Sequence, residues 1–259
     1  GRFTEFDPLR QCTVEVVKIV RAEIAPETAL LLSRTDPDLA DENFAFVRPA
    51  SGEVAIVSLD GEPKHLVMPN TTRVFWKAIT AVGVELVDTE KALRVEKRHL
   101  DKIEATRTGG AIVSAVVDEY EAGLLFVDGV LTERLAPGRH AFWSVGRDVR
   151  IVKMEMRPQP LEVTAQEILT KDRVGIRVTL TAFTRVVDPE KAARAASDVN
   201  ATLYRLIQFA IREAVAARTL DDILAARHAI DGEVRAYVTN RAGPLGVEEG
   251  ERDRKSTRL

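Results

Sequence analysis

Apolar and polar residues alternate over much of this chain, and the longest alternating stretch covers residues 173–188. One face of this stretch carries apolar side chains, and the other is mostly arginine and threonine. The apolar positions are Val174, Ile176, Val178, Leu180 and Ala182. A period of two is typical of a strand with one buried face. We therefore expect one long, half-buried strand over residues 173–188.

After this strand the apolar spacing changes to three and four residues, which predicts helices. Asp188 and Pro189 are the residue types preferred at the N-cap and the first position of a helix. Thr219 and Asp222 form a variant capping box, with Asp in place of Glu or Gln. The later predicted helices cover residues 201–218, 220–226 and 230–241. This order, with strands first and helices last, predicts an α+β fold.

An internal repeat precedes these helices. Residues 53–61 and 121–129 have similar patterns, and each is followed by a proline and then by a Phe-Trp pair. These pairs are Phe75-Trp76 and Phe142-Trp143, so the offset is 68 residues at first and 67 at the tryptophans. We interpret the two segments as tandem antiparallel β modules that repeat about every 68 residues. Gly1-Arg2-Phe3 matches Gly138-Arg139-His140, which predicts that a partial first copy opens the chain.

Turn chemistry supports the repeat. Asp60-Gly61 and Asp128-Gly129 separate apolar runs, and Asp-Gly favours a type I′ hairpin because both central residues need a positive φ. Gly138 follows a proline, where a type II turn also needs a positive φ. The earlier copy has Asn70 at this position, and Asn tolerates that conformation well. Different residues thus meet the same backbone requirement in the two copies.

Composition limits the chemistry. The 37 Lys and Arg residues balance 40 Asp and Glu residues, so nucleic acid is not an expected partner. Cys12 is the only cysteine, which fits a reducing compartment such as the cytoplasm. No stretch approaches the roughly 20 apolar residues that span a bilayer. The histidines lack metal-ligand spacing, and no nucleophile elbow or phosphate loop occurs. They are His65, His99, His140 and His228.

Two further patterns have a structural interpretation. Glu119 and Glu121 have no spacing that favours an acid/base pair over solvated strand edges. Arg139-His140 beside an aromatic pair is better explained by packing than by nucleic-acid binding, because the earlier copy has a similar arrangement. We therefore predict no catalytic, cofactor-binding or metal-binding residue, no cofactor and no enzymatic activity.

Five motifs between Tyr120 and Arg241 resemble the stomatin/prohibitin/flotillin superfamily, the Band 7 or SPFH domain, in its slipin (stomatin-like) branch. They are GLLFVDG at 123–129, LAPGRH at 135–140, EILTKDRV at 167–174, RVVDP at 185–189 and LDDIL at 220–224. The resemblance implies an α+β domain that forms membrane-associated oligomers and regulates membrane proteins such as proteases. It implies no catalytic residue. The upstream copy resembles the duplicated N-terminal β modules of some bacterial slipins.

These inferences predict four regions. They are a partial first repeat with a linker at 1–50, a second repeat at 51–117, a Band 7 domain at 118–244, and a disordered or artefactual tail at 245–259. In the third region we expect a sheet covered by C-terminal helices.

The favoured function is an oligomeric scaffold on the cytoplasmic side of a membrane. The chain would attach peripherally or through a segment outside the present sequence. A soluble adaptor or ligand-binding β module and a hydrolase with an unrecognised site remain alternatives. We expect self-association through apolar residues left exposed on the C-terminal helices. These residues are Leu224, Ile230, Val234 and Val238.

Overall fold

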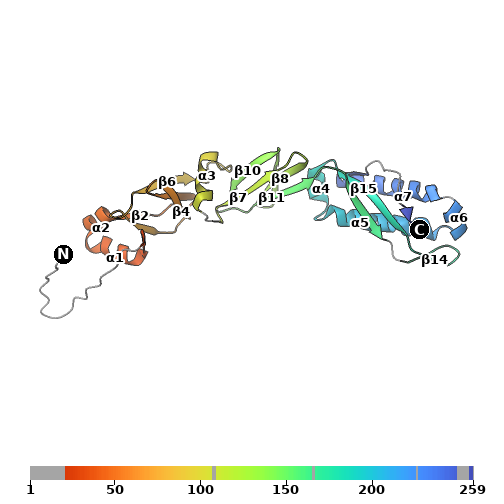
Figure 1. Cartoon of the computed structure of the whole chain (residues 1–259), viewed down its shortest axis with the longest axis horizontal. Coiled ribbons are helices and arrows are strands. Elements are labelled where there is room, and N and C mark those ends of the chain that lie inside the picture. Colours follow the sequence, from red (N-terminus) through yellow and green to blue (C-terminus); the bar gives the residue numbers. More distant parts are fainter. Residues whose placement is uncertain (1–20, 107–108, 165–166, 226, 250–256, 259) are drawn as a thin grey trace, which may run out of the picture. The chain divides into compact units, whose positions relative to one another are not determined.

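The computed structural model describes residues 21–106, 109–164, 167–225, 227–249 and 257–258 (Figure 1). The chain forms two compact units, Gly1–Ala111 and Ile112–Leu259. The partial first copy predicted at Gly1-Arg2-Phe3 lies outside the described residues.

The N-terminal unit contains two antiparallel sheets of three strands, with the orders β1-β5-β2 and β4-β3-β6. Their strands are β1 (Glu23–Ile24), β2 (Phe44–Val47), β3 (Glu53–Leu59), β4 (Glu62–Val67), β5 (Arg73–Trp76) and β6 (Val82–Asp88). Buried side chains from both sheets form one apolar cluster. Its members are Val47, Ala55, Val57, Val67 and Phe75. The alternation in these strands therefore buries one face of each sheet against the other.

Two helices that the sequence analysis did not predict precede β2. They are α1 (Pro26–Thr35) and α2 (Pro37–Asn43). Asp36 caps α2 by accepting a hydrogen bond from the Leu39 amide at 3.1 Å. Ala29 of α1 and Ala40 of α2 pack with Phe44 and Val74. The two helices thus cover an apolar face of the first sheet.

A third helix, α3 (Lys97–Thr106), packs against β4. The helix also contacts β6, because the Glu85 carboxylate on that strand bonds to His99 of α3 at 3.2 Å and to Lys102 of α3. The helix therefore covers the β4 side of the second sheet.

In the C-terminal unit, β7 (Ile112–Val117) pairs with β10 (Gly138–Trp143). A second sheet has the order β11-β8-β9 and consists of β8 (Glu121–Val127), β9 (Val130–Leu135) and β11 (Val149–Glu155). The central strand again pairs with the next strand in the chain and with a later one, as in β4-β3-β6. Each hairpin has a register irregularity, after Val57 in β3 and after Leu125 in β8. The tandem repeat stays a prediction, and these shared features are consistent with it.

The predicted turn conformations are confirmed. The φ angles are 52° and 85° at Asp60 and Gly61, and 50° and 80° at Asp128 and Gly129. Asn70 also has a positive φ, of 57°. In both hairpins the Asp amide donates a hydrogen bond to the residue just before the third strand of the sheet. Asp60 bonds to the Ala81 carbonyl at 2.9 Å, and Asp128 bonds to the Asp148 carbonyl at 2.8 Å.

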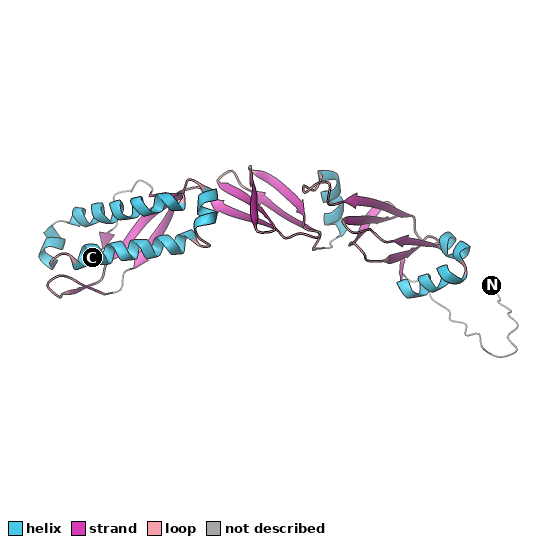
Figure 2. Cartoon of the chain, turned by 180° about the vertical axis from the view of Figure 1, so that it is seen from behind, coloured by secondary structure: helices cyan, strands magenta, loops and turns pink. Residues whose placement is uncertain are grey.

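The rest of the C-terminal unit is a sheet covered by helices, as predicted (Figure 2). Strand β15 (Thr179–Val186) pairs with β12 (Gln159–Thr164), β16 (Val247–Glu249) and β17 (Thr257–Arg258). The helices are α4 (Pro189–Ala195), α5 (Val199–Ala216), α6 (Leu220–Ala225) and α7 (Arg227–Ala242), followed by the 3-10 turn η1 (Gly243–Leu245). The predicted caps are present: Asp188 accepts from the Lys191 amide, and Thr219 and Asp222 bond reciprocally.

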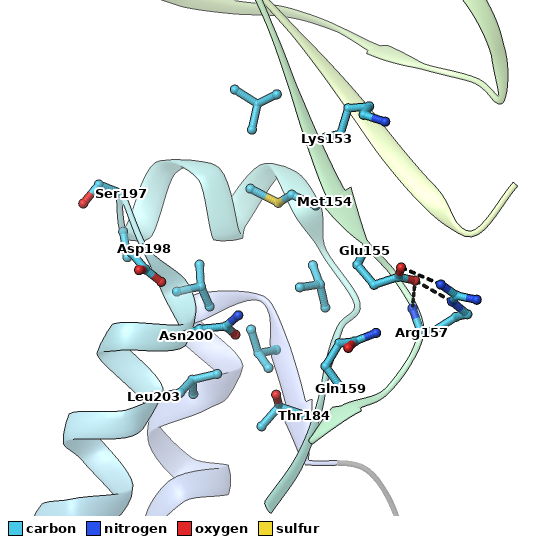
Figure 3. A pocket seen from close by; sticks show the side chains of 15 residues that line it. Lys153, Met154, Glu155, Arg157, Gln159, Thr184, Ser197, Asp198, Asn200 and Leu203 are labelled. Carbon is cyan, nitrogen blue, oxygen red and sulfur yellow. Dashed lines mark hydrogen bonds and ion pairs between the residues drawn. The ribbon is translucent and has the colours of Figure 1, made fainter. Parts of the chain in front are cut away.

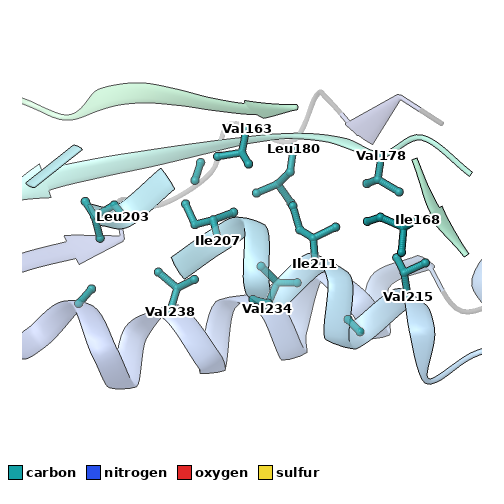
Figure 4. Packing of buried hydrophobic residues seen from close by; sticks show 14 of the residues in the cluster. Val163, Ile168, Val178, Leu180, Leu203, Ile207, Ile211, Val215, Val234 and Val238 are labelled. Carbon is teal, nitrogen blue, oxygen red and sulfur yellow. The ribbon is translucent and has the colours of Figure 1, made fainter. Parts of the chain in front are cut away.

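Helices α5 and α7 share one core with the sheet (Figure 4). Leu180 of β15 faces Ile207 and Ile211 of α5, and Val234 and Val238 of α7 pack into the same cluster. The last two are only 4% and 3% exposed. The expectation that they stay exposed on the C-terminal helices is therefore wrong. Helix α7 packs against α5 within the same chain, so its apolar stripe already has a partner.

The strand expected over residues 173–188 is confirmed only over residues 179–186, where its apolar face is buried, and it is not continuous before them. The chain instead forms a short hairpin, β13 (Ile168–Leu169) and β14 (Gly175–Ile176), before β15 begins at Thr179. Thr170 closes the turn by accepting a bond from the Val174 amide at 3.0 Å, and Arg173 takes a φ of 66°. This side chain-to-backbone bond competes with extension of the strand.

The tail expected to be disordered at 245–259 begins with structure. Val247 is 2% exposed, and the strand β16 pairs with the end of β15. Gly246, with a φ of 69°, accepts hydrogen bonds from the Val187 and Asp188 amides. Residues 250–256 and 259 lie outside the described residues. Long-range strand pairing, which local composition does not reveal, orders residues 247–249.

We expect Gly129→Val to destabilise the β8–β9 hairpin. Nothing lies within 4 Å of a Cβ added at Gly129, so the cost comes from the positive φ alone and should be roughly 1–3 kcal/mol. Gly129→Asn is the matched control, because Asn tolerates this conformation. Denaturant unfolding measures the free energy of unfolding of the Val and Asn variants. It is followed by Trp143 fluorescence in a Trp76→Phe background. Equal stability of the Val and Asn variants would contradict the proposed origin of the cost.

Val234→Asp should unfold the C-terminal unit rather than disturb a surface. A carboxylate without a partner in this core costs more than about 3 kcal/mol. Leu224→Asp provides the control, because Leu224 is 59% exposed and its change should stay within about 0.5 kcal/mol. Urea unfolding followed by far-UV circular dichroism distinguishes them. A Val234→Asp variant as stable as the parent would show that α7 does not pack as described.

Candidate functional site

Titratable side chains in the described residues do not gather into a metal site. No group of three or more His, Cys, Asp or Glu residues among them is placed to hold a metal ion. Burial, followed by the neighbouring Arg73, lowers the pKa of His65, whose ring lies 5.3 Å from that of Phe75. His140 bonds to the Ala136 carbonyl at 2.7 Å. The side chain of His228 lies outside the described residues.

The two carboxylates considered from the sequence do not form an acid/base pair. Glu121 bonds to Lys153 at 2.8 Å, and this bond is the main cause of its lowered pKa. Glu119 is exposed. The Glu121 carboxylate also stabilises the turn between β7 and β8, because it accepts a hydrogen bond from the Asp118 amide at 3.2 Å. Its contacts are those of a structural ion pair.

One pocket of the C-terminal unit has a volume of about 360 Å³ (Figure 3). It lies where β11, β12 and β15 meet the connection between α4 and α5. Its apolar wall includes Met154, Val186, Leu203 and Val247. Polar side chains complete the lining, and they are Lys153, Glu155, Arg157, Gln159, Thr184, Ser197, Asp198 and Asn200.

The charged groups of this pocket already have partners. Arg157 holds Glu155 through two side-chain hydrogen bonds, of 2.7 and 2.8 Å, which lower the pKa of Glu155 (Figure 3). The guanidinium of Arg157 also lies 3.8 Å from the centre of the Tyr120 ring. Asp198 caps α5 by accepting from the Ala201 amide at 2.9 Å. With its charges paired, this mixed lining suits binding of a small amphipathic molecule or peptide side chain better than acid/base chemistry.

A second candidate site is an apolar surface at the end of the C-terminal unit that carries the β13–β14 hairpin and α6 (Figure 1). Three exposed apolar side chains lie on these elements, and we call them together the hairpin patch: Leu169 and Val174 from the hairpin, and Leu224 from α6. Their exposed fractions are 60%, 38% and 59%. Exposed apolar groups on neighbouring elements often mark an interaction site.

Backbone and side-chain bonds anchor the hairpin to the start of α6. The Lys171 amide donates to the Arg218 carbonyl at 2.8 Å, and the Leu220 amide donates to Asp172 at 3.2 Å. The hydroxyl of Thr170 also donates to Asp172, and this bond is the first cause of the lowered pKa of Asp172.

The sequence analysis did not predict the pocket, which combines residues from 152 to 247 that no local pattern joins. It predicted one member of the hairpin patch, Leu224, as an exposed residue for self-association, and this residue is exposed. The other two members were not predicted, although Thr170-Lys171-Asp172 interrupts the alternation between Leu169 and Val174. The predicted continuous strand includes Val174.

Asp172→Asn should loosen the hairpin in a pH-dependent way. The hydrogen bonds lower the folded pKa, so the stabilisation from Asp172 is present above the ordinary aspartate pKa, about 3.9. It is lost as the pH falls through the lower folded value. The difference in melting temperature between parent and variant should therefore be present at neutral pH and shrink below about pH 4. Asp221→Asn, on the helix α6 to which Asp172 is bonded, is the control. A difference that stays constant down to about pH 2 would exclude this role.

Among the described residues, no helix is both long enough and apolar enough to cross a bilayer.

Comparison with known proteins identifies the C-terminal unit. A protein of Archaeoglobus fulgidus that is named only as uncharacterized is 29% identical over 133 residues, which are 51% of this chain and 53% of that protein. A stomatin homolog of Pyrococcus horikoshii is 28% identical over 133 residues, 51% of this chain and 49% of its own length. Stomatin of Mus musculus is 26% identical over 133 residues, 51% of this chain and 47% of its own length. The chain thus spans about half the length of these relatives.

The family comparison gives the same result over a similar stretch. Residues 115–249 match the SPFH domain / Band 7 family. The stretch includes the β8–β9 hairpin with its Asp-Gly turn, the helix-covered sheet and both candidate sites. It covers just over half of the 259 residues, so this chain belongs to the SPFH domain / Band 7 family.

Proposed function

We propose that this chain is part of a non-catalytic scaffold that associates with a membrane surface and assembles with copies of itself. The observation that carries the proposal is the family match over residues 115–249, with relatives that include stomatin and a stomatin homolog. The paired charges in the pocket and the structural role of Glu121 are consistent with a role without catalysis. We further propose a position on the cytoplasmic side of the membrane, reached peripherally or through a segment outside this sequence.

The hairpin patch is our proposed contact between copies in the C-terminal unit. It replaces the face of α7 that the sequence suggested, because Val234 and Val238 are buried within the chain. Leu169 and Leu224 are each about three-fifths exposed. Burial of the exposed part of each side chain contributes roughly 1–2 kcal/mol. Association of two chains has its own entropic cost, so this contact by itself supports only weak self-association. A membrane protein, such as a protease, is the further partner that we propose for the assembled scaffold.

The pocket favours a second candidate function, a ligand-binding adaptor. Its apolar wall and paired polar groups suit an amphipathic ligand of modest size. An adaptor of this kind would bind its ligand without a membrane. Ligand binding that persists in the absence of lipid would therefore distinguish the adaptor from the scaffold.

The scaffold proposal predicts that the chain floats with lipid vesicles and that it associates through the hairpin patch. Flotation with vesicles of neutral and anionic lipid tests the first part. Sedimentation velocity up to about 100 micromolar tests the second. Leu169→Asp with Leu224→Asp should weaken self-association about tenfold or more, because each Asp places a charge in the contact.

Val130→Asp is the matched control for these variants. Val130 is 66% exposed on β9 and lies in the same unit but outside the hairpin patch. Absence of the full-length protein from membranes would contradict the membrane role. Equal association of the Asp variants and the control would exclude the hairpin patch as the contact.

A further inference from the structure

The outer edge of β6 in the N-terminal unit carries exposed apolar side chains, and no strand among the described residues pairs with it. In the described residues β6 is the last strand of its sheet and pairs only with β3. Val84 and Leu86 are 47% and 58% exposed. Helix α3 packs against β4, at the opposite edge of the sheet, and it also reaches β6 through Glu85, which bonds to His99 and Lys102. An exposed edge strand with apolar side chains readily pairs with another strand.

The C-terminal unit provides an internal comparison. Leu86 lies opposite Ala55 on β3, and Lys153 lies opposite Gly123 on β8, so the two residues occupy the same place in their sheets. Lys153 donates to the Val116 carbonyl at 3.1 Å and pairs with Glu121. The edge strand β11 thus carries a lysine, a residue that commonly blocks strand pairing.

The corresponding module of the C-terminal unit folds with a lysine at this position, and Leu86 itself is more than half exposed. Its side chain therefore contributes little to packing within the described residues. An apolar side chain of this kind, exposed on an unpaired strand edge, points to an intermolecular contact. The remaining question is which strand pairs with it.

The sequence of β6 matches a second copy of itself. In an antiparallel pair centred on Val84, Leu86 lies opposite Val82 of the other copy, so apolar side chains meet on one face. Glu85 lies opposite Gly83, so the two carboxylates do not face each other. Each Glu85 is already bonded to Lys102 of its own α3. Cross-strand pairs of this kind stabilise a sheet, whereas like charges directly opposite would destabilise it.

We propose that two copies of this chain associate through their β6 strands, centred on Val84, to form one continuous six-stranded sheet. Three strands come from each copy. The contact lies outside the family-matched residues and is independent of the hairpin patch and of membrane binding. Together, an edge contact in one unit and a patch contact in the other would link copies into assemblies larger than a dimer.

Leu86→Lys tests the proposal with a residue that the corresponding position already accepts. Sedimentation velocity up to about 100 micromolar should show at least about tenfold weaker dimerisation for Leu86→Lys. Leu31→Lys is the matched control, because Leu31 is 66% exposed on α1, away from β6. The comparison uses the Leu169→Asp/Leu224→Asp background, so that loss of the hairpin-patch contact is not mistaken for loss of this one.

Cysteine cross-linking tests the register. In a Cys12→Ser background, Val84→Cys should form a disulfide with its copy, because facing residues of antiparallel strands lie within disulfide range. Leu86→Cys alone should not cross-link, whereas a mixture with Val82→Cys should. A monomer in the hairpin-patch background at about 100 micromolar would overturn the proposal. Equal dimerisation of Leu86→Lys and Leu31→Lys, or cross-linking of Leu86→Cys to itself, would do the same.

Discussion

Burial of the apolar face of β15 is the contact on which the C-terminal unit depends. This strand pairs with β12, β16 and β17, and its inward residue Leu180 contacts the core formed by α5 and α7. One strand therefore joins residues from 159 to 258. Helices α5 and α7 are both used as cover, so Val234 and Val238 are buried within the chain. The hairpin and α6 each contribute to this core through Ile168 and Ile223, while Leu169 and Leu224 stay exposed on the same elements.

A different constraint governs the β modules. Two Asp-Gly turns with positive φ set the hairpins, and the strand order around each central strand is the same. Side chains at the edges of these sheets differ, as Leu86 and Lys153 illustrate. A substitution at an edge strand changes how a module associates with other chains but has little effect on the stability of its core. Modules with similar backbones can therefore make different contacts.

The described part of the chain uses its charges for structure. Glu155 bonds to Arg157, Asp198 caps α5, and Asp172 ties the hairpin to α6. These carboxylates have their pKa values lowered or their oxygens occupied by partners, which leaves few groups suited to proton transfer.

Local chemistry in the sequence was sufficient for turns, caps and the class of fold. The Asp-Gly turns, the Asp188 cap and the Thr219–Asp222 capping box depend on residues a few positions apart, so the sequence alone determined them. It also carried the family motifs and the order of strands before helices. Tertiary structure decided which faces are buried. Val234 and Val238 are covered because α7 packs on α5, and residues 247–249 are ordered because β15 pairs with them. The pocket likewise forms only when four separate regions meet. These outcomes depend on contacts between distant residues, whose free energy is not encoded in any local pattern.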